Sequence, residues 1–191
     1  RKAIVDDFSG VTRDRQYGVC DWNGKTFNVI DTGGFVSRSE DIFEKEIRKQ
    51  VHIAIDEADV IVFVTDVTAS ITDLDDDMAQ LLRRSVKPVI LAVNKVDNSD
   101  RQLDATEFYV LGFEHTFFIS SISGSGSGDL LDKVPELMPP DYEGLDVAET
   151  EEIETEDEDG NIITMVREKN PIPKIAIIGQ PNAGKSTLLN S

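Results

Sequence analysis

A glycine-rich loop that joins an apolar strand to the start of a helix constrains this chain more than any other feature. Residues 174–178 form an apolar run typical of a strand buried on both faces of a parallel sheet, and residues 187–189 begin a helix. Between them, residues 179–186 read G-Q-P-N-A-G-K-S, which fits the phosphate-binding pattern G-x-x-x-x-G-K-[ST]. The strand and helix on either side make a chance glycine turn a much weaker interpretation.

Each residue type in this loop suits one part of a nucleotide polyphosphate. Glycines allow backbone N–H groups to wrap the phosphates, Lys185 is expected to contact the β- and γ-phosphate oxygens, and the Ser186 hydroxyl is expected to bind Mg²⁺. The predicted nucleotide-binding residues of the loop are Gly179, Asn182, Ala183, Gly184, Lys185, Ser186 and Thr187. The loop therefore predicts a nucleoside triphosphate site that uses Mg²⁺.

The rest of the chain alternates strand patterns with helix patterns. Two short strand patterns flank Asn23-Gly24, the dipeptide of a tight β-hairpin. The expected strands span residues 16–22, 25–31, 60–64, 88–93, 116–119 and 174–178, and the expected helices span residues 41–57, 73–85, 103–111 and 129–138. This alternation predicts an α/β fold with a doubly wound, mostly parallel sheet in a three-layer arrangement. Ligands of such sheets bind beyond the carboxyl ends of the strands.

Residues 94–97, Asn-Lys-Val-Asp, directly follow one expected strand and can reach a base held over the sheet. The Asp97 carboxylate can accept hydrogen bonds from both the N1–H and the exocyclic amine of guanine, a pair of donors that adenine does not offer. Asn94, Lys95 and Asp97 are therefore predicted to bind guanine nucleotide and to favour GTP over ATP. Taken alone, N-K-x-D fits a polar loop after a strand equally well.

Three further segments lie in the expected order around this site. Asp31, at the end of a strand, is predicted to hold Mg²⁺ through water, and the Gly34 N–H is predicted to reach the γ-phosphate. Thr12 is predicted to close on Mg²⁺ when the γ-phosphate is present. The predicted cover of the guanine base comes from the backbone N–H groups of Ser120, Ser121 and Ile122. Each segment alone has a plainer interpretation, as a turn, an ordinary loop threonine or a loose Ser/Gly connection.

Together, these motifs closely resemble those of the Der (EngA) family of tandem G-domain GTPases. The resemblance covers essentially the whole chain, through A-I-V-D-D-F-S-G-V-T-R-D-R, I-D-T-G-G-F, V-N-K-V-D, S-S-I-S-G-S-G-S-G-D-L-L and K-I-A-I-I-G-Q-P-N-A-G-K-S-T-L-L-N. It implies the P-loop GTPase fold and a GTP-binding, GTP-hydrolysing switch protein with GTP or GDP and Mg²⁺ as cofactors. It further implies a role in assembly of the large (50S) ribosomal subunit in the bacterial cytoplasm.

The resemblance also implies that the chain is a fragment. Residues 1–140 correspond to a first G domain without its own phosphate-loop strand, residues 141–170 to an acidic linker, and residues 171–191 to the opening strand, phosphate loop and helix start of a second G domain. Because base contacts and phosphate loop then come from two domains, the chain alone is expected to bind nucleotide poorly and to turn over slowly or not at all. The rival hypotheses are a circularly permuted single-domain GTPase and a non-hydrolysing nucleotide-binding module.

Three positions carry expectations of their own from the resemblance. Phe35 stands where Ras-like enzymes carry a catalytic Gln, so the attacking water must be positioned otherwise; a core contact is the alternative role of Phe35. By resemblance to GTPases with Pro-Asn in the phosphate loop, Asn182 would help to hold a K⁺ ion whose charge replaces an arginine finger. Ser121 stands where the family usually has Ala, a difference of little expected effect because the contact is through the backbone.

The formal net charge of −18 is concentrated in one segment. Residues 141–159 contain eleven carboxylates and no Lys or Arg, which predicts a solvated, mobile linker, with an acidic docking tail as the alternative. An acidic chain argues against a direct nucleic-acid site. No apolar run approaches the roughly 18 residues of a membrane span. Cys20 is the only cysteine and cannot form an intramolecular disulfide, which favours a reducing cytoplasm.

The most specific structural prediction concerns the strand before the phosphate loop. The family's strand order leaves an open slot between the strands at 25–31 and 59–65, and exposed strand edges recruit compatible strands. Burial of Ile175, Ile177 and Ile178 contributes roughly 6 kcal/mol, against on the order of 3 kcal/mol for closing the connecting loop. Residues 174–179 are therefore expected to pair in parallel between those two strands.

Overall fold

The computed structural model describes residues 16–31, 51–139, 150–156, 162–168 and 172–189. The predicted catalytic positions Thr12, Gly34 and Phe35 lie outside these described residues, so their roles stay predictions. The other predicted site residues all fall within the described part of the chain.

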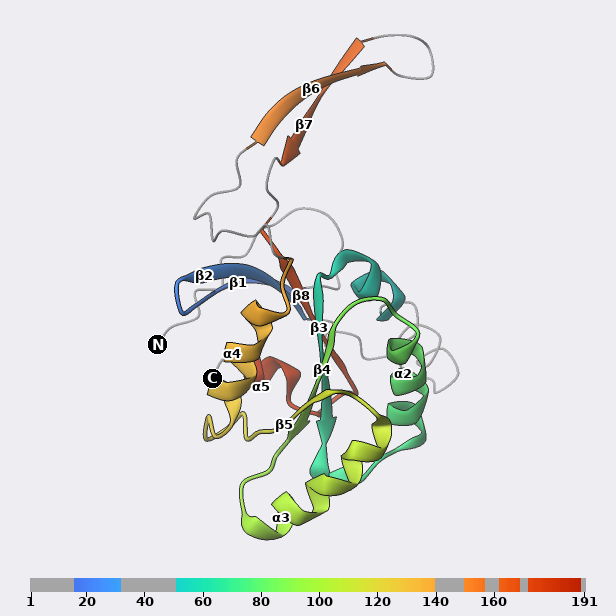
Figure 1. Cartoon of the computed structure of the whole chain (residues 1–191), viewed down its shortest axis with the longest axis vertical. Helices are drawn as coiled ribbons and strands as arrows, with labels where there is room; N and C mark the ends of the chain where they lie inside the picture. The colour runs from blue at the N-terminus through green and yellow to red at the C-terminus, as the bar shows by residue number, and fades with distance from the viewer. Residues whose placement is uncertain (1–15, 32–50, 140–149, 157–161, 169–171, 190–191) are drawn as a thin grey trace.

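A six-stranded sheet with the strand order β1-β2-β8-β3-β4-β5 forms the centre of the molecule (Figure 1). Its strands are β1 (Gln16–Trp22), β2 (Lys25–Asp31), β3 (Val60–Asp66), β4 (Val89–Asn94), β5 (His115–Phe118) and β8 (Lys174–Gly179). Only β1 runs antiparallel to its neighbour, and every other adjacent pair is parallel. The mostly parallel α/β sheet predicted from the sequence is confirmed.

The β1–β2 hairpin turns at Asn23 and Gly24, whose φ angles are 51° and 77°. Two successive residues with positive φ match the twist of the flanking strands, which is why Asn-Gly is favoured in such turns. The turn is tied to helix α4 (Ser127–Glu136), because Trp22 Nε1 and Asn23 Nδ2 both donate to Asp132 Oδ1, at 2.6 and 2.7 Å. This tether fixes the outer edge of the sheet against a helix.

Strand β8 occupies the slot between β2 and β3, as predicted. It is parallel to both neighbours, with Ile175 opposite Val29 on one side and Val60 on the other. Asp59 fixes the register at the start of the strand, since its N–H donates to the Lys174 carbonyl at 2.7 Å while its Oδ2 accepts from the Lys174 N–H at 2.9 Å. The loop that follows β8 is thereby placed at the carboxyl edge of the sheet.

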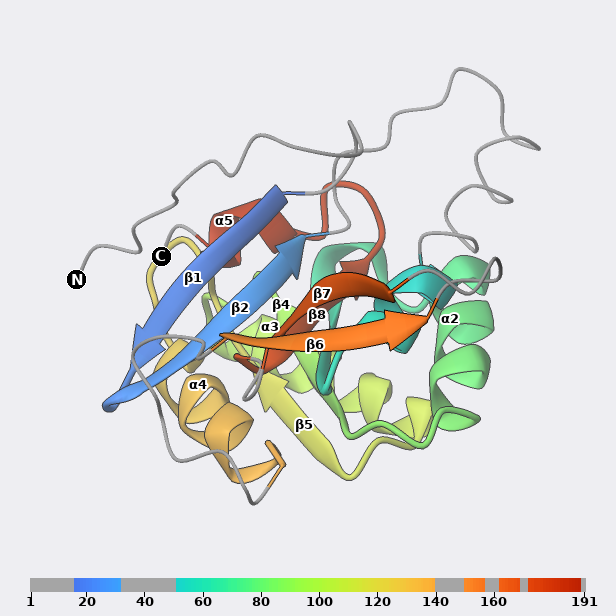
Figure 2. The ribbon, with the colours of Figure 1, turned by 90° about the horizontal axis from the view of Figure 1, so that it is seen from above.

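Helices cover both faces of the sheet and produce three layers (Figure 2). Helical residues 51–57, helix α2 (Asp73–Arg83) and the 3₁₀ helix η2 (Ala105–Leu111) pack on one face, and α4 and α5 (Lys185–Leu189) pack on the other. Alternate residues of β3 supply the two cores, with Ile61 and Phe63 in the first and Val60, Val62 and Val64 in the second. Among the helices of the described residues, none is long and apolar enough to cross a membrane.

The segment predicted as a helix over 103–111 differs in the structure. An α-helix, α3 (Ser99–Asp104), begins four residues earlier, because the Asn98 side chain caps it by accepting from the Arg101 N–H at 2.9 Å. Residues 105–111 then continue as the 3₁₀ helix η2. Its buried residues Ala105, Phe108 and Leu111 are three apart, which is the repeat of a 3₁₀ helix and not of an α-helix.

A second sheet corrects the interpretation of the acidic segment as a linker without regular structure. Strands β6 (Thr150–Glu156) and β7 (Ile162–Glu168) pair antiparallel, with Ile153 opposite Met165, and stand away from the main sheet (Figure 1). The carboxylates in β6 suggested a mobile chain, but β7 contains the β-branched residues typical of strands, and pairing with it satisfies the backbone of the acidic strand.

Candidate functional site

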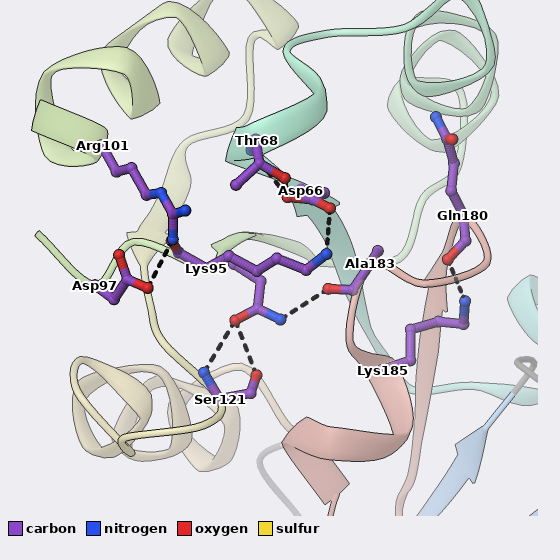
Figure 3. A network of polar contacts seen from close by, with 10 residues as sticks. Asp66, Thr68, Lys95, Asp97, Arg101, Ser121, Gln180, Ala183 and Lys185 are labelled. Carbon is purple, nitrogen blue, oxygen red and sulfur yellow. Dashed lines mark hydrogen bonds and ion pairs between the residues drawn. The ribbon is translucent and has the colours of Figure 1, made fainter.

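The carboxyl ends of the parallel strands place the predicted site residues at one edge of the sheet. Asp31 ends β2, Gly179 ends β8 and Asn94 ends β4, while Ser120 and Ser121 follow β5. The base-side polar contacts and the phosphate loop lie next to one another there (Figure 3). The fold therefore brings together segments that are separated by more than 150 residues in the sequence, such as Asp31 and Ser186.

The phosphate loop packs tightly against the neighbouring strand. A Cβ at Gly179 would lie 2.1 Å from the carbonyl oxygen of Val64, so only glycine fits at the end of β8. Lys185 is 5% exposed, and its Nζ donates to the carbonyl oxygens of Gly179 and Gln180 at 2.8 and 2.6 Å. Burial lowers the pKa of Lys185, and the Asp31 carboxylate opposes that shift. Phosphate oxygens are better partners for this ammonium than two carbonyls.

Ser186, at the end of the phosphate loop, and Asp31, at the end of β2, are in direct contact. The Ser186 hydroxyl donates to Asp31 Oδ2 at 2.9 Å, and Asp31 is only 4% exposed. A hydroxyl and a carboxylate at the phosphate edge are the hard oxygen donors that Mg²⁺ prefers. These two residues therefore fit the magnesium role that the sequence assigned to them.

Asn94 connects the phosphate loop to the segment after β5. Its Nδ2 donates to the Ala183 carbonyl at 2.7 Å, and its Oδ1 accepts from the N–H and the hydroxyl of Ser121, both at 3.0 Å. Gly184 makes this approach possible, because a Cβ there would lie 2.2 Å from Asn94 Nδ2. The sequence predicted Asn94 and Ser121 as nucleotide-binding residues, and this stays a prediction; in the structure the two residues connect the phosphate loop to the segment after β5.

The remaining residues predicted to cover the base are placed differently from one another. Ser120 is 3% exposed and its N–H donates to the Ser125 carbonyl at 2.9 Å. Ile122, by contrast, is 89% exposed.

In the phosphate loop, Asn182 and Thr187 are exposed, and Asn182 has a φ of 65°. A backbone in the left-handed region suits Asn better than most residues.

Lys95 pairs with Asp66, a carboxylate at a strand end that the sequence marked as a place for ligands without predicting this pair. Its Nζ lies 2.5 Å from Asp66 Oδ2, and Asp66 Oδ1 accepts from the N–H and the hydroxyl of Thr68 at 2.9 and 2.7 Å. Burial by itself would raise the pKa of Asp66, but the hydrogen bonds from Lys95 and Thr68 outweigh it and lower that pKa. The available signal was the position of Asp66 at the end of β3, on the same edge as Asp31.

Asp97 lies at the more exposed end of the site. Its side chain is 50% exposed, and its two oxygens accept from Arg101 Nη1 at 2.6 Å and from Asn98 Nδ2 at 3.1 Å. Arg101 Nη1 also donates to the Lys95 carbonyl at 3.1 Å. The carboxylate is thus available to solvent on one side and held by protein donors on the other.

Besides its contacts with Asp31 and Asn94, the phosphate loop contacts helix α2. Thr72 and Asp75 form a capping box at the start of α2, and Gln180 Nε2 donates to Thr72 Oγ1. Asp75 is 2% exposed, and burial raises the pKa of its carboxyl against the opposing hydrogen bonds from Thr72. Nothing in the local sequence pairs Gln180 with Thr72, because 108 residues separate them.

Comparisons with known proteins agree with this geometry. A family model described as "50S ribosome-binding GTPase" matches residues 1–95. The chain is 52% identical over all 191 residues to GTPase Der of Christiangramia forsetii and of Flavobacterium johnsoniae, and 49% identical to GTPase Der of Porphyromonas gingivalis. In each case the chain spans 39% of the relative's length. With a sheet of the P-loop GTPase type, this chain is similar along its full length to a 39% portion of the GTPase Der proteins.

Proposed function

We propose that this chain binds guanine nucleotide and Mg²⁺ at the carboxyl edge of its six-stranded sheet. The observation that carries the proposal is the position of Asn94, which hydrogen-bonds both the phosphate loop at Ala183 and the segment after β5 at Ser121. This arrangement keeps phosphate-binding and base-reading groups at a fixed separation, as one bound nucleotide requires. Pre-organisation of this kind reduces the cost of ordering the site on binding.

In this proposal the residues around the phosphate loop bind the phosphates and Mg²⁺, and Asp97 binds the base. Lys185 exchanges its two carbonyl partners for β- and γ-phosphate oxygens, and backbone N–H groups of residues 182–184 surround the phosphates. Ser186 and Asp31 hold Mg²⁺, which would neutralise charge on the phosphates. Asp97 accepts from the two N–H donors of guanine, and this pairing selects GTP over ATP.

We further propose that the whole protein hydrolyses GTP. Thr12 and Gly34 keep the predicted roles of switch threonine and γ-phosphate contact. Phe35 stands at the position of the catalytic Gln of Ras-like enzymes, so the attacking water is positioned by other groups. Asn182 keeps its predicted role in holding K⁺, supported by its exposed place in the loop beside the phosphate-binding backbone. Single-turnover hydrolysis of GTP in K⁺ and in Na⁺ buffers tests both points, since a non-hydrolysing module would show no turnover in either.

The wider role follows from the relatives and is likewise a proposal. We propose a cytoplasmic switch protein that acts with the 50S ribosomal subunit, as the description of the matched family model suggests. In a tandem arrangement, residues 1–140 belong to a first G domain, 141–170 to a linker and 171–191 to the start of a second. The central place of β8 is expected both for such a fragment and for the alternative, a circularly permuted domain in which this phosphate loop serves this sheet.

Equilibrium titration of the chain with fluorescent GDP, followed by competition with unlabelled GDP and ADP, tests the proposal. We expect GDP to compete and ADP not to compete, and we expect Lys185→Ala to weaken binding at least about 100-fold, or about 2.7 kcal/mol. Equal competition by ADP would contradict guanine selection. The dissociation constant of GDP from the chain distinguishes the tandem fragment from the circularly permuted domain. Micromolar binding favours the permuted domain, and weaker binding favours the tandem fragment.

A further inference from the structure

Arg101 occupies an unusual place beside the proposed base-reading carboxylate. A single guanidinium nitrogen, Nη1, donates both to Asp97 Oδ2 at 2.6 Å and to the Lys95 carbonyl at 3.1 Å (Figure 3). We propose that Arg101 is a positioning residue that fixes Asp97 for guanine selection. The inference rests on the proposed function, because it concerns the same nucleotide site.

The loop around Asp97 needs such support. Lys95 has a φ of 67°, a backbone conformation that costs energy for a residue other than glycine. Arg101 donates to the carbonyl of this residue and to the side chain of Asp97, so it links two parts of the loop at residues 95–97. Without Arg101, a carboxylate that is 50% exposed would be held only by the longer hydrogen bond from Asn98 and would exchange rotamers more readily.

Arg101 is itself anchored at the start of α3. Its N–H donates to Asn98 Oδ1 at 2.9 Å, and Asn98 Nδ2 donates to the second oxygen of Asp97 at 3.1 Å. Each oxygen of the carboxylate therefore has one protein donor. Because an ionised carboxylate offers about two acceptor positions on each oxygen, one position per oxygen remains for guanine.

This arrangement predicts an effect on selection and not on stability. Exposed ion pairs such as that of Asp97 with Arg101 stabilise proteins only slightly. Guanine presents two donors, so recognition needs both oxygens of Asp97 in the plane of the base. Hypoxanthine, the base of inosine diphosphate, keeps the N1–H but lacks the exocyclic amine. It therefore forms only one hydrogen bond with Asp97, and that single bond can persist when the carboxylate rotates.

The test measures the affinities of GDP and inosine diphosphate for the chain and for its Arg101→Ala variant. We expect GDP binding to weaken about fivefold and inosine diphosphate binding to weaken less than about twofold, so that the preference for GDP falls. Arg101→Lys should restore part of the preference, because an ammonium can reach one of the two acceptors. Lys133→Ala is the matched control, since it breaks the ion pair with Glu136 on α4, at 2.8 Å, away from the site.

A double-mutant cycle with Asp97→Asn separates positioning from a general effect on the loop. If Arg101 acts through Asp97, Arg101→Ala should change GDP affinity less than about 1.5-fold in the Asp97→Asn background. Equal losses for both nucleotides, no loss at all, or an undiminished loss in that background would each overturn the inference while leaving the proposed function intact. A wild-type chain that binds no GDP would overturn both.

Discussion

On the side of the site that is proposed to bind phosphate, Asp31 and Lys185 are 4% and 5% exposed, whereas on the side proposed to bind the base the Asp97 side chain is 50% exposed. The phosphate-side groups are also part of the packed interior, since Ala183 belongs to one of the two hydrophobic cores. Asp97, by contrast, is held near the surface by an ion pair and by the residue that caps α3. A change at Asp31 or Lys185 should therefore affect folding and binding together, while a change at Asp97 should affect selection alone.

The largest effect is expected where the two sides meet. Asn94→Ala leaves the buried Ala183 carbonyl and Ser121 N–H without partners, and each such group costs about 1–3 kcal/mol. We expect the free energy of unfolding to fall by about 3 kcal/mol, measured by urea denaturation. Asn98→Ala, which removes a surface helix cap, should cost only about 1 kcal/mol. Equal losses for the two variants would mean that Asn94 does not join the two sides.

Asp97→Asn should separate selection from stability. The amide presents a donor to the donors of guanine, so GDP binding is expected to weaken at least about tenfold, or about 1.4 kcal/mol, and xanthine nucleotides should be favoured instead. The free energy of unfolding should change by less than about 0.5 kcal/mol, because the ion pair that Asp97 forms with Arg101 is exposed. Calorimetric titration with GDP and xanthosine diphosphate measures the first effect, and unchanged GDP affinity would show that Asp97 does not read the base.

Patterns of alternating and continuous apolar residues were sufficient to predict the main sheet. The insertion of β8 between β2 and β3 was predicted from the resemblance, because the family's strand order leaves that slot open in this chain. The meeting of Asp31 and Ser186 followed in turn, since both lie at carboxyl ends of neighbouring strands. The strands themselves depend on local sequence, whereas their order was known only through the resemblance.

The contacts that connect the site could not be predicted in the same way. Asn94 reaches partners 27 and 89 residues away, and the pairing depends on backbone positions that no local pattern encodes. The same holds for Gln180 and Thr72. The β6–β7 hairpin was missed for a different reason, because the charge of its first strand outweighed the strand pattern of its second.

The smallest effect in the comparison is expected at Asp66, which is 17% exposed at its side chain and pairs with Lys95. Its pKa is lowered in the folded state, so the ionised carboxylate stabilises the fold above the unfolded value of about 3.9, and this contribution is lost as the pH falls through the folded pKa. Asp66→Asn should therefore cost about 0.5–1 kcal/mol at pH 7 and clearly less at pH 3, measured by urea denaturation at both values. The exposure of Asp66 is intermediate between that of Asp31 and that of Asp97. If Asp66→Asn lowered the free energy of unfolding by about 3 kcal/mol or more at pH 7, Asp66 would behave energetically like a buried charge. A pH-independent loss would instead show that the Thr68 cap, and not the charge of Asp66, accounts for its contribution.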